Sequence, residues 1–279
     1  MNLKRILLTG ATGFVGQQVL KFLLNEDVRI RCIVREGKKS ELPISKKLES
    51  PLVTKDLFEE SEEWWRSALE GIHTIIHAAW YAEPGKYQLS PKNLDCLLGS
   101  IVMAKAAISS GVKRFVGIGT CFEYQQAGEK LTTDAPLGPT SPYAATKASA
   151  YLSLSHIFPI CGVEFAWCRL FYLYGEGEDP RRLVQSLRLS LSEGREVALT
   201  AGNQVRDFLD VAEAGQRIAK VALGKVTGAV NICSGMPVTV RELAESIADE
   251  YRRRDLLQFG ARPENPVDPS FVVGIPTPL

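Results

Sequence analysis

The chain has 279 residues, of which 45% are hydrophobic, and its formal net charge is +1. This length suffices for one large domain or for a large domain with a smaller lobe. The balanced charge gives no electrostatic basis for binding nucleic acid or an anionic membrane surface, and no apolar stretch reaches membrane-spanning length. Six scattered cysteines without a C-x-x-C pair argue against metal or disulfide frameworks, so we expect a cytoplasmic protein with no metal site.

The first informative segment is a glycine-rich turn, Ile6-Leu-Leu-Thr-Gly10-Ala-Thr-Gly13-Phe-Val-Gly16. An apolar run of strand length leads into three glycines spaced G-x-x-G-x-x-G, and the residues that follow are apolar at helical intervals. Glycine lets the backbone turn sharply and approach a pyrophosphate, whose charge a helix N-terminus stabilises. The turn therefore predicts a dinucleotide site, with an ordinary glycine-rich strand-to-helix turn as the alternative.

Strand and helix patterns alternate through the first half of the chain. Strands are expected at 28–34, 52–53, 74–77, 115–119 and 163–170, with a long helix at about 94–109. This order predicts an α/β fold, a doubly wound parallel sheet of the Rossmann type with right-handed crossovers. The ligand of such a sheet is expected beyond the carboxyl ends of the strands.

The segment Ser141-Pro-Tyr-Ala-Ala-Thr-Lys147 follows a proline-rich stretch and is expected to begin a helix near Ser141. Tyr143 and Lys147 are four residues apart, so their side chains share one face of that helix. A phenol beside a fixed positive charge ionises more readily and can exchange a proton at a carbon that bears oxygen. The pair predicts acid–base chemistry on a bound substrate.

From about Gly175 the pattern is less regular, with helices expected at 181–191, 211–223 and 240–251 among short apolar segments. We expect residues 1–174 to form a dinucleotide-binding Rossmann domain. Residues 175–279 are expected to form a smaller C-terminal substrate lobe, interleaved with the first domain, that closes over the cofactor.

With these two motifs the chain resembles the extended short-chain dehydrogenase/reductases, and more narrowly the NAD-dependent epimerase/dehydratase group acting on nucleoside-diphosphate sugars. Members of this group commonly continue past the position of Leu279, so a shortened C-terminus is expected. The resemblance covers nearly the whole chain through six further segments: His77-Ala-Ala79, Gly119-Thr-Cys-Phe-Glu-Tyr124, Arg169-Leu-Phe-Tyr-Leu-Tyr-Gly175, Val205-Arg-Asp-Phe-Leu-Asp-Val211, Asn231-Ile-Cys-Ser-Gly235 and Phe259-Gly-Ala-Arg262.

The resemblance implies NADP or NAD as the cofactor. Arg35 ends the second expected strand, where an acidic residue would favour NAD. A cation there, followed by Lys38 and Lys39, suits the 2′-phosphate of NADP, although it could equally stack on the adenine of NAD; we lean towards NADP. For His77 a role in strand packing is the alternative. The implied cofactor-binding residues are Gly10, Thr12, Gly13, Phe14, Val15, Gly16, Arg35, Asp56, Leu57, His77, Ala78, Ala79, Tyr143, Lys147 and Leu170.

The resemblance also implies the catalytic roles. Tyr143 is the expected acid–base group, and Lys147 is expected to lower its pKa and to hold the nicotinamide ribose. Thr120 is expected to hydrogen-bond the reacting oxygen and fix its position. A strand-end threonine that only satisfies backbone groups is the alternative for Thr120.

Thr120, Tyr172, Arg206 and Arg262 are the expected substrate-binding residues. The two arginines are candidates for clamping the diphosphate of the substrate, because guanidinium matches phosphate oxygens in a bidentate manner. Both have acidic neighbours in the sequence, so ordinary salt-bridged arginines are the alternative.

One difference from the group's sequence pattern limits which reactions the chain is expected to catalyse. Its 4,6-dehydratases carry Thr-Asp-Glu at the active strand end, where two carboxyls run the elimination, but here the residues are Thr120-Cys121-Phe122. Glu123 is displaced by one position and is expected on the opposite face of an extended segment. This argues against dehydration and favours hydride transfer at a secondary alcohol or ketone of the sugar, at C4, by a 4-keto reductase or a 4-epimerase.

Two other functions stay open: reduction of a non-nucleotide ketone, and a cofactor-binding scaffold without turnover. A homodimer is expected through helices 94–109 and 143–157, whose equivalents form the dimer interface in the group. The alternative is that these helix faces simply pack on the sheet. Neither nucleic acid nor a membrane is expected as a partner.

Overall fold

The structure is a computed structural model that describes residues 3–265 and 268–279. Its main feature is a seven-stranded parallel sheet with the strand order β10-β6-β5-β4-β1-β2-β3. The doubly wound α/β fold predicted from the sequence is confirmed. The strands are β1 (Lys4–Thr9), β2 (Val28–Arg35), β3 (Leu52–Thr54), β4 (Thr74–His77), β5 (Arg114–Thr120), β6 (Glu164–Leu170) and β10 (Gly228–Ile232).

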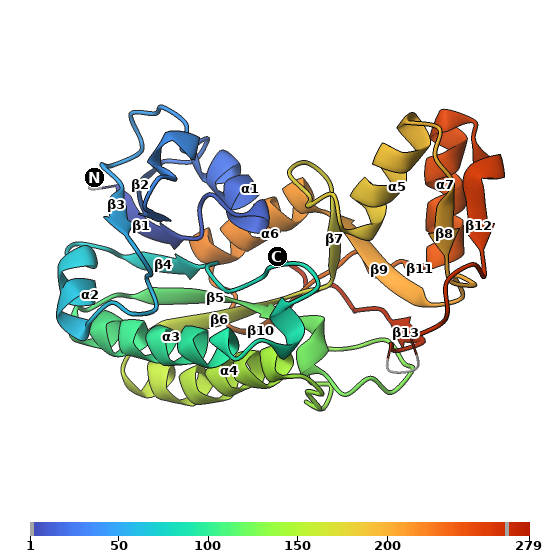
Figure 1. Ribbon diagram of the computed structural model, residues 1–279. Coiled ribbons are helices and arrows are strands. Elements are labelled where there is room, and N and C mark those ends of the chain that lie inside the picture. Colours follow the sequence, from blue (N-terminus) through green and yellow to red (C-terminus); the bar gives the residue numbers. More distant parts are fainter. Residues whose placement is uncertain (1–2, 266–267) are drawn as a thin grey trace.

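Helices cover both faces of this sheet (Figure 1). On one face lie α1 (Phe14–Leu23) and α6 (Val211–Leu223), and on the other α2 (Glu62–Ala68), α3 (Lys92–Ser109) and α4 (Pro142–Ile160). Successive strand residues point to opposite faces, so Ile6 and Leu8 pack with α1 and α6, whereas Leu7 packs with α2 to α4. The central strand β5 is buried on both faces, and each of its residues is buried, whereas β2 alternates apolar residues with arginines.

A second lobe lies beyond the carboxyl ends of the strands (Figure 1). In it α5 (Leu183–Ser192) and α7 (Val240–Tyr251) pack on β8 (Val197–Leu199) and β12 (Leu257–Phe259) around a core of their own. A small sheet of β7 (Tyr172–Tyr174), β9 (Val205–Asp210), β11 (Pro237–Thr239) and β13 (Phe271–Val272) connects this lobe to the main one. Four short 3-10 helices complete the structure: η1 (Lys39–Glu41), η2 (Tyr87–Leu89), η3 (Cys121–Glu123) and η4 (Arg254–Leu256).

The chain after residue 175 is divided between the two lobes. It contributes α6 and β10 to the Rossmann sheet, and α5, α7 and their strands to the second lobe. α6 is tightly packed on α1, because a Cβ on Gly215 would lie 2.6 Å from the backbone carbonyl carbon of Gln18. No helix in the described part of the chain is both long and apolar enough to cross a bilayer.

Most element boundaries fall within two residues of the expected ones. The helix expected from residue 181 begins later, at Leu183, because Asp179 first turns the chain: its carboxylate accepts from the Arg181 amide and its carbonyl from the Arg182 amide. The long helix begins earlier than expected, at Lys92, directly after Pro91.

Candidate active site

The glycine-rich turn lies at the carboxyl end of β1, whose neighbours in the sheet are β2 and β4. Gly10 has a φ of +71°, and a Cβ there would lie 2.8 Å from the Ala79 amide nitrogen. A Cβ on Gly16 would lie 2.0 Å from the Gly10 carbonyl oxygen, so neither position has room for a side chain. Helix α1 starts after Gly13 without a side-chain cap or an acidic residue in its first turn. Its first amide groups are therefore available to an anion such as a dinucleotide pyrophosphate.

His77, at the end of β4, is buried and its ring is fully hydrogen-bonded. Its Nδ1 lies 2.9 Å from the Thr9 hydroxyl and its Nε2 lies 2.9 Å from the Ser100 hydroxyl. Burial lowers the pKa of His77 to about 3, so the imidazole is neutral. Because Ser100 donates its own proton to the Cys96 carbonyl, 2.6 Å away, we assign the proton of His77 to Nε2. The ring thus joins β4 to β1 and α3, and both of its nitrogens are engaged within the protein.

Arg35, the last residue of β2, is exposed, and its guanidinium has no hydrogen bond or ion pair with any described residue. Lys38 forms an ion pair with Glu41. Asp56 accepts a hydrogen bond of 2.9 Å from the Phe58 amide and thereby fixes the turn that contains Leu57. These residues all follow the carboxyl ends of β2 and β3, on the side of the sheet where the glycine-rich turn lies.

The three predicted catalytic residues come together at the end of β5. Ser141 caps α4 by accepting from the Ala144 amide, which places Tyr143 in the first turn of the helix and Lys147 one turn later. Thr120 is the last residue of β5, and its hydroxyl accepts a hydrogen bond of 3.3 Å from the Phe122 amide. The Tyr143 phenol lies near enough for the Thr120 side chain to lower its pKa. The Lys147 ammonium donates to the carbonyl of Ile118, two residues earlier on β5, at 2.6 Å.

The charge states of this pair differ from the expectation. Burial raises the pKa of the Tyr143 phenol, Tyr87, Glu123 and Cys121 raise it further, and the Thr120 side chain lowers it. The Lys147 ammonium is directed at the Ile118 carbonyl and lies 3.7 Å from the ring centroid of Trp80. Burial also lowers the pKa of Lys147 itself, to about 7.

Two aromatic residues join this site that the sequence patterns did not identify. Trp80 lies under the Lys147 ammonium and is held by a hydrogen bond of 2.9 Å from its indole nitrogen to Asn93. Tyr87 packs edge-to-face on Tyr143, with 4.7 Å between ring centroids. The position of Trp80, directly after His77-Ala-Ala79, was a signal for the first; nothing in the sequence marked Tyr87.

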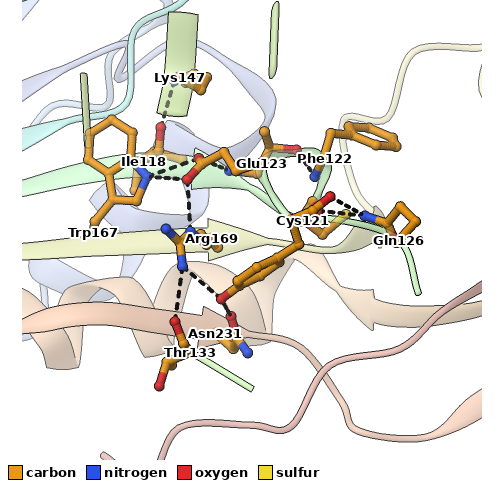
Figure 2. A network of polar contacts seen from close by, with 12 residues as sticks. Ile118, Cys121, Phe122, Glu123, Gln126, Thr133, Lys147, Trp167, Arg169 and Asn231 are labelled. Atoms are coloured by element: carbon orange, nitrogen blue, oxygen red, sulfur yellow. Dashed lines mark hydrogen bonds and ion pairs between the residues drawn. The ribbon is translucent and has the colours of Figure 1, made fainter. Parts of the chain in front are cut away.

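Buried polar groups lie behind the end of β5 (Figure 2). The carboxylate of Glu123 forms an ion pair of 2.8 Å with Arg169, and both side chains are almost completely inaccessible to solvent. Glu123 is thus buried and paired with β6, but residues 121–123 form the 3-10 helix η3 and not the extended segment from which its opposite-face position was predicted. Phe122 is directed away from this network (Figure 2) and Cys121 is buried, so the dehydratase carboxyls have no equivalent at this strand end.

The predicted substrate residues lie on the second lobe and its connecting sheet. Tyr172 in β7 is half-buried between Phe122 and Phe208, whose ring centroids are 6.0 Å and 5.9 Å from its own. The Arg206 guanidinium lies 5.2 Å from the Tyr172 ring centroid and forms an ion pair of 2.8 Å with Asp268. Leu170, at the end of β6, is half-buried.

Asp207 and Glu264, the acidic residues close in sequence to Arg206 and Arg262, accept hydrogen bonds from other parts of the chain. Asp207 accepts hydrogen bonds from Ser234, Gly235 and Gly274, and Glu264 accepts from Ala201 and Gln204. Arg262 is exposed at the edge of a cavity of about 480 Å³ in the second lobe. This cavity is lined by Arg181, Leu183, Ser186, Leu187, Ser190, Glu196, Val197, Ala198, Leu199 and Arg262.

Comparison with known proteins gives consistent results. Residues 6–233 match the family model described as the NAD dependent epimerase/dehydratase family. A curated relative, dTDP-6-deoxy-L-talose 4-dehydrogenase (NAD(+)) of Aggregatibacter actinomycetemcomitans, is 24% identical over 273 residues, which cover 96% of this chain and 98% of its own length. CDP-abequose synthase of Salmonella muenchen is 24% identical over 272 residues, covering 92% of this chain and 84% of its own.

Solved structures have the same fold at similar identity. The UDP-N-acetylglucosamine 4-epimerase of Methanobrevibacter ruminantium, in complex with UDP-N-acetylmuramic acid, superposes with a TM-score of 0.87 at 22% identity, covering 99% of this chain and 91% of its own. The UDP-glucose 4-epimerase of Thermus thermophilus, in complex with NAD, gives a TM-score of 0.81 at 23% identity over 98% of this chain and 90% of its own.

Proposed function

Because the chain belongs to the NAD-dependent epimerase/dehydratase family, we propose that it is an oxidoreductase that acts on a nucleoside-diphosphate sugar. The reaction is hydride transfer at a secondary alcohol or ketone of the sugar, at C4. The observation that carries this proposal is the placement of Tyr143 and Lys147, one helical turn apart on α4, beside the carboxyl end of β5, where Thr120 is the last residue. The glycine-rich turn follows β1, which lies two strands from β5 in the sheet. The first turn of α1 has no side-chain cap, so its amide groups suit the pyrophosphate of a dinucleotide.

The chain's own residues supply the proton chemistry. A bound nicotinamide ring supplies or accepts the hydride at the reacting carbon. In the reductive direction the Tyr143 phenol gives its proton to the carbonyl oxygen as that oxygen gains negative charge, and in the oxidative direction the phenolate takes the alcohol proton. The Thr120 hydroxyl holds the same oxygen, which keeps the reacting atoms aligned. Lys147 provides positive charge near the phenol and a donor for the nicotinamide ribose.

Elimination of water is not part of the proposed reaction. The residues that follow Thr120 are Cys121 and Phe122, and burial raises the pKa of the Cys121 thiol to about 12, which keeps it neutral. Neither side chain can therefore act as a base at neutral pH. A 4-keto reductase or a 4-epimerase remains, in line with the 4-position named for the dehydrogenase relative and for the two superposed epimerases.

Whether the protein binds NADP or NAD distinguishes the 4-keto reductase from the 4-epimerase. Arg35 is exposed and unpaired among the described residues, which supports NADP and hence a reductase that exchanges its cofactor in each turnover. A 4-epimerase is supported instead if NAD stays bound and is regenerated within one cycle.

On the substrate side we assign the nucleoside diphosphate to the second lobe. Arg262 and Arg181 line one cavity there, and guanidinium groups suit diphosphate oxygens. The Arg206 guanidinium lies against the Tyr172 ring, but it is buried and ion-paired with Asp268, so binding a diphosphate would require this pair to open. The half-buried rings of Tyr172 and Phe122 are proposed to pack against the apolar face of the sugar.

The test combines binding and turnover. Melting temperatures are measured with UDP, dTDP, CDP and GDP, each with NAD or NADP, and the dinucleotide absorbance is followed with the matching 4-keto and 4-hydroxy sugars. A ligand at about 100 times its Kd adds about 2.7 kcal/mol to the free energy of unfolding, which is a shift of a few degrees. The Tyr143→Phe variant is expected to show the same shifts and to lose turnover by about 10²-fold or more.

The negative outcomes identify the alternatives. If no nucleoside diphosphate raises the melting temperature while a dinucleotide does, a non-nucleotide ketone is the substrate. If nucleotide sugars bind but neither direction turns over, the chain is a cofactor-binding scaffold. Undiminished turnover in Tyr143→Phe would remove Tyr143 from the mechanism.

A further inference from the structure

Glu123 is a completely buried carboxylate immediately behind the active-site end of β5. It follows Thr120 by three residues in η3 and accepts a hydrogen bond of 2.8 Å from the Thr120 amide. It also accepts from the Trp167 indole nitrogen at 2.9 Å and from the Arg169 guanidinium at 2.8 Å. An unpaired buried carboxylate would be strongly destabilising, so these donors hold the group in one position.

The contact between this carboxylate and the strand is close. A Cβ on Gly119 would lie 2.4 Å from Oε1 of Glu123 and 2.1 Å from the Trp167 indole nitrogen, so the backbone of β5 packs directly on both groups. Within the same three residues, the Ile118 carbonyl accepts from the Lys147 ammonium, and Thr120 carries the side chain that lowers the pKa of Tyr143. Glu123 thus supports the backbone segment that orients both partners of the catalytic tyrosine.

The network behind Glu123 anchors it to the neighbouring strands (Figure 2). The Arg169 guanidinium, on β6, donates to the Tyr124 hydroxyl at 2.9 Å. Tyr124 in turn donates to the Asn231 side chain, on β10, at 2.7 Å. The carboxylate is therefore tied, through two side chains, to the strands that lie beside β5 at the edge of the sheet.

We propose that Glu123 is a positioning residue of the active site: its buried carboxylate fixes the end of β5, and with it the Thr120 hydroxyl and the Lys147 ammonium, in the arrangement that proton transfer requires. This inference rests on the proposed function, because Tyr143 must be the acid–base group for the positions of Thr120 and Lys147 to matter.

The charge of Glu123 also affects the pKa values of Lys147 and Tyr143. The other titratable groups that face Lys147 are the Cys96 thiol on α3, whose pKa burial raises to about 11, and the neutral His77 on β4. Glu123, which is ion-paired with Arg169, raises the pKa of both Lys147 and Tyr143. Removing that charge is therefore expected to release both protons at lower pH.

The experiment compares Glu123→Gln with Tyr124→Phe. Both substitutions disturb the same buried network, but only the first changes a group that contacts Thr120 and faces Lys147. Glu123→Gln is expected to lower kcat by about tenfold to a hundredfold, since small displacements of reacting groups have effects of this size, and to change the dinucleotide Kd much less. Its pH–rate profile is expected to move to lower pH. Tyr124→Phe is expected to keep both kcat and the profile.

A second measurement does not depend on turnover. In the full chain labelled with [13C]lysine, the Cε resonance of Lys147, assigned by its loss in Lys147→Arg, reports the protonation of the ammonium. Its titration midpoint is expected near neutral pH in the unchanged protein and at lower pH in Glu123→Gln. If the midpoint does not move, or if Glu123→Gln keeps full kcat, the positioning role is wrong. A shifted midpoint together with an active Tyr143→Phe would instead overturn the proposed function alone.

Glu123→Gln leaves the buried Arg169 without its anion and could prevent folding. The double variant Glu123→Gln/Arg169→Met removes both charges together and replaces the guanidinium with an apolar side chain of similar length. It is expected to fold and to show the same losses as the single variant. Full activity of the folded double variant would likewise overturn the proposal.

Discussion

The Lys147 ammonium shows how burial changes a residue that sequence alone would describe as a simple positive charge. It has 3% of its surface exposed, and its contacts are the Ile118 carbonyl and the face of the Trp80 indole. Neither contact is an anion, so the cost of burying the charge dominates and lowers the pKa of Lys147 from 10.5 to about 7. The group can therefore change its charge near neutral pH, where an exposed lysine cannot.

This lowered pKa predicts a specific pH dependence of stability. Between pH 7 and 10.5 the unfolded chain binds a proton at this lysine that the folded protein does not, so the free energy of unfolding rises with pH. From pH 6 to pH 9 the gain from this one group is about 2–3 kcal/mol. Urea unfolding of the unliganded protein and of Lys147→Met at both pH values measures it.

The Lys147→Met variant is expected to gain stability at pH 6 and little at pH 9. The matched control is Lys113→Met, at an exposed lysine, which should change stability by the same small amount at both pH values. Equal effects of Lys147→Met at pH 6 and pH 9 would show that Lys147 titrates as an exposed lysine does.

Among the elements, the β1–α1 turn is the one whose sequence is most tightly constrained by its geometry. Gly10 adopts a left-handed φ against Ala79, and Gly16 lies inside the first turn of α1 against the Gly10 carbonyl. The turn must be this tight for the first amides of α1 to face a pyrophosphate without a side chain between them. The glycine spacing in the sequence, the left-handed φ of Gly10 and the expected pyrophosphate ligand all fit the same tight turn.

Gly16→Ala tests this element. The added methyl group would lie 2.0 Å from the Gly10 carbonyl oxygen, so the turn must shift. We expect a loss of about 1–3 kcal/mol in the free energy of unfolding and a larger fractional loss of dinucleotide affinity than of sugar-nucleotide affinity. Calorimetric titration with each ligand measures the two affinities.

The control is Lys21→Ala on the exposed side of the same helix, which removes only a surface ion pair with Glu176. Such pairs contribute about 0–1 kcal/mol, so both affinities should persist. Undiminished dinucleotide binding by Gly16→Ala would mean that the cofactor does not lie on this turn.

At the scale of the whole molecule, the layer formed by α3 and α4 carries exposed apolar side chains. Leu94 and Leu98 on α3 are 56% and 58% exposed, and Leu152, Ile157 and Ile160 on α4 are 49%, 49% and 84% exposed. The other sides of both helices are buried against the sheet, so packing on the sheet accounts for only part of their apolar surface. We propose that this layer forms the interface of a homodimer, whose four helices would cover these residues.

The double variant Leu98→Glu/Leu152→Glu tests the proposed dimer. It places charges on the exposed surface of both helices, where the cost to the folded monomer is small, about 0.5 kcal/mol or less for each site. Light scattering after size exclusion is expected to give a dimer for the unchanged protein and a monomer for the variant. Leu189→Glu, at a leucine of α5 that is 40% exposed, is the control and should stay dimeric. A monomer before any substitution would contradict the proposal.

Local sequence patterns were sufficient to predict the helices and strands, and to predict the relative direction of side chains within one motif. Strands buried on both faces are apolar runs, the β1–α1 turn requires glycine, and Tyr143 and Lys147 face the same way because they are one helical turn apart. The α/β class and the shared direction of Tyr143 and Lys147 could therefore be predicted from residues close together in the chain.

Tertiary structure decided whatever depends on groups distant in sequence. Glu123 meets Arg169 across 46 positions, and Lys147 reaches Ile118 across 29. The placement of Trp80 and Tyr87 beside the catalytic pair has the same origin. The charge of Lys147 also could not be predicted, because a pKa depends on the solvent and charges around a group. A sequence motif specifies which groups are present and their local direction, whereas packing alone determines how much water and which neighbours each group keeps.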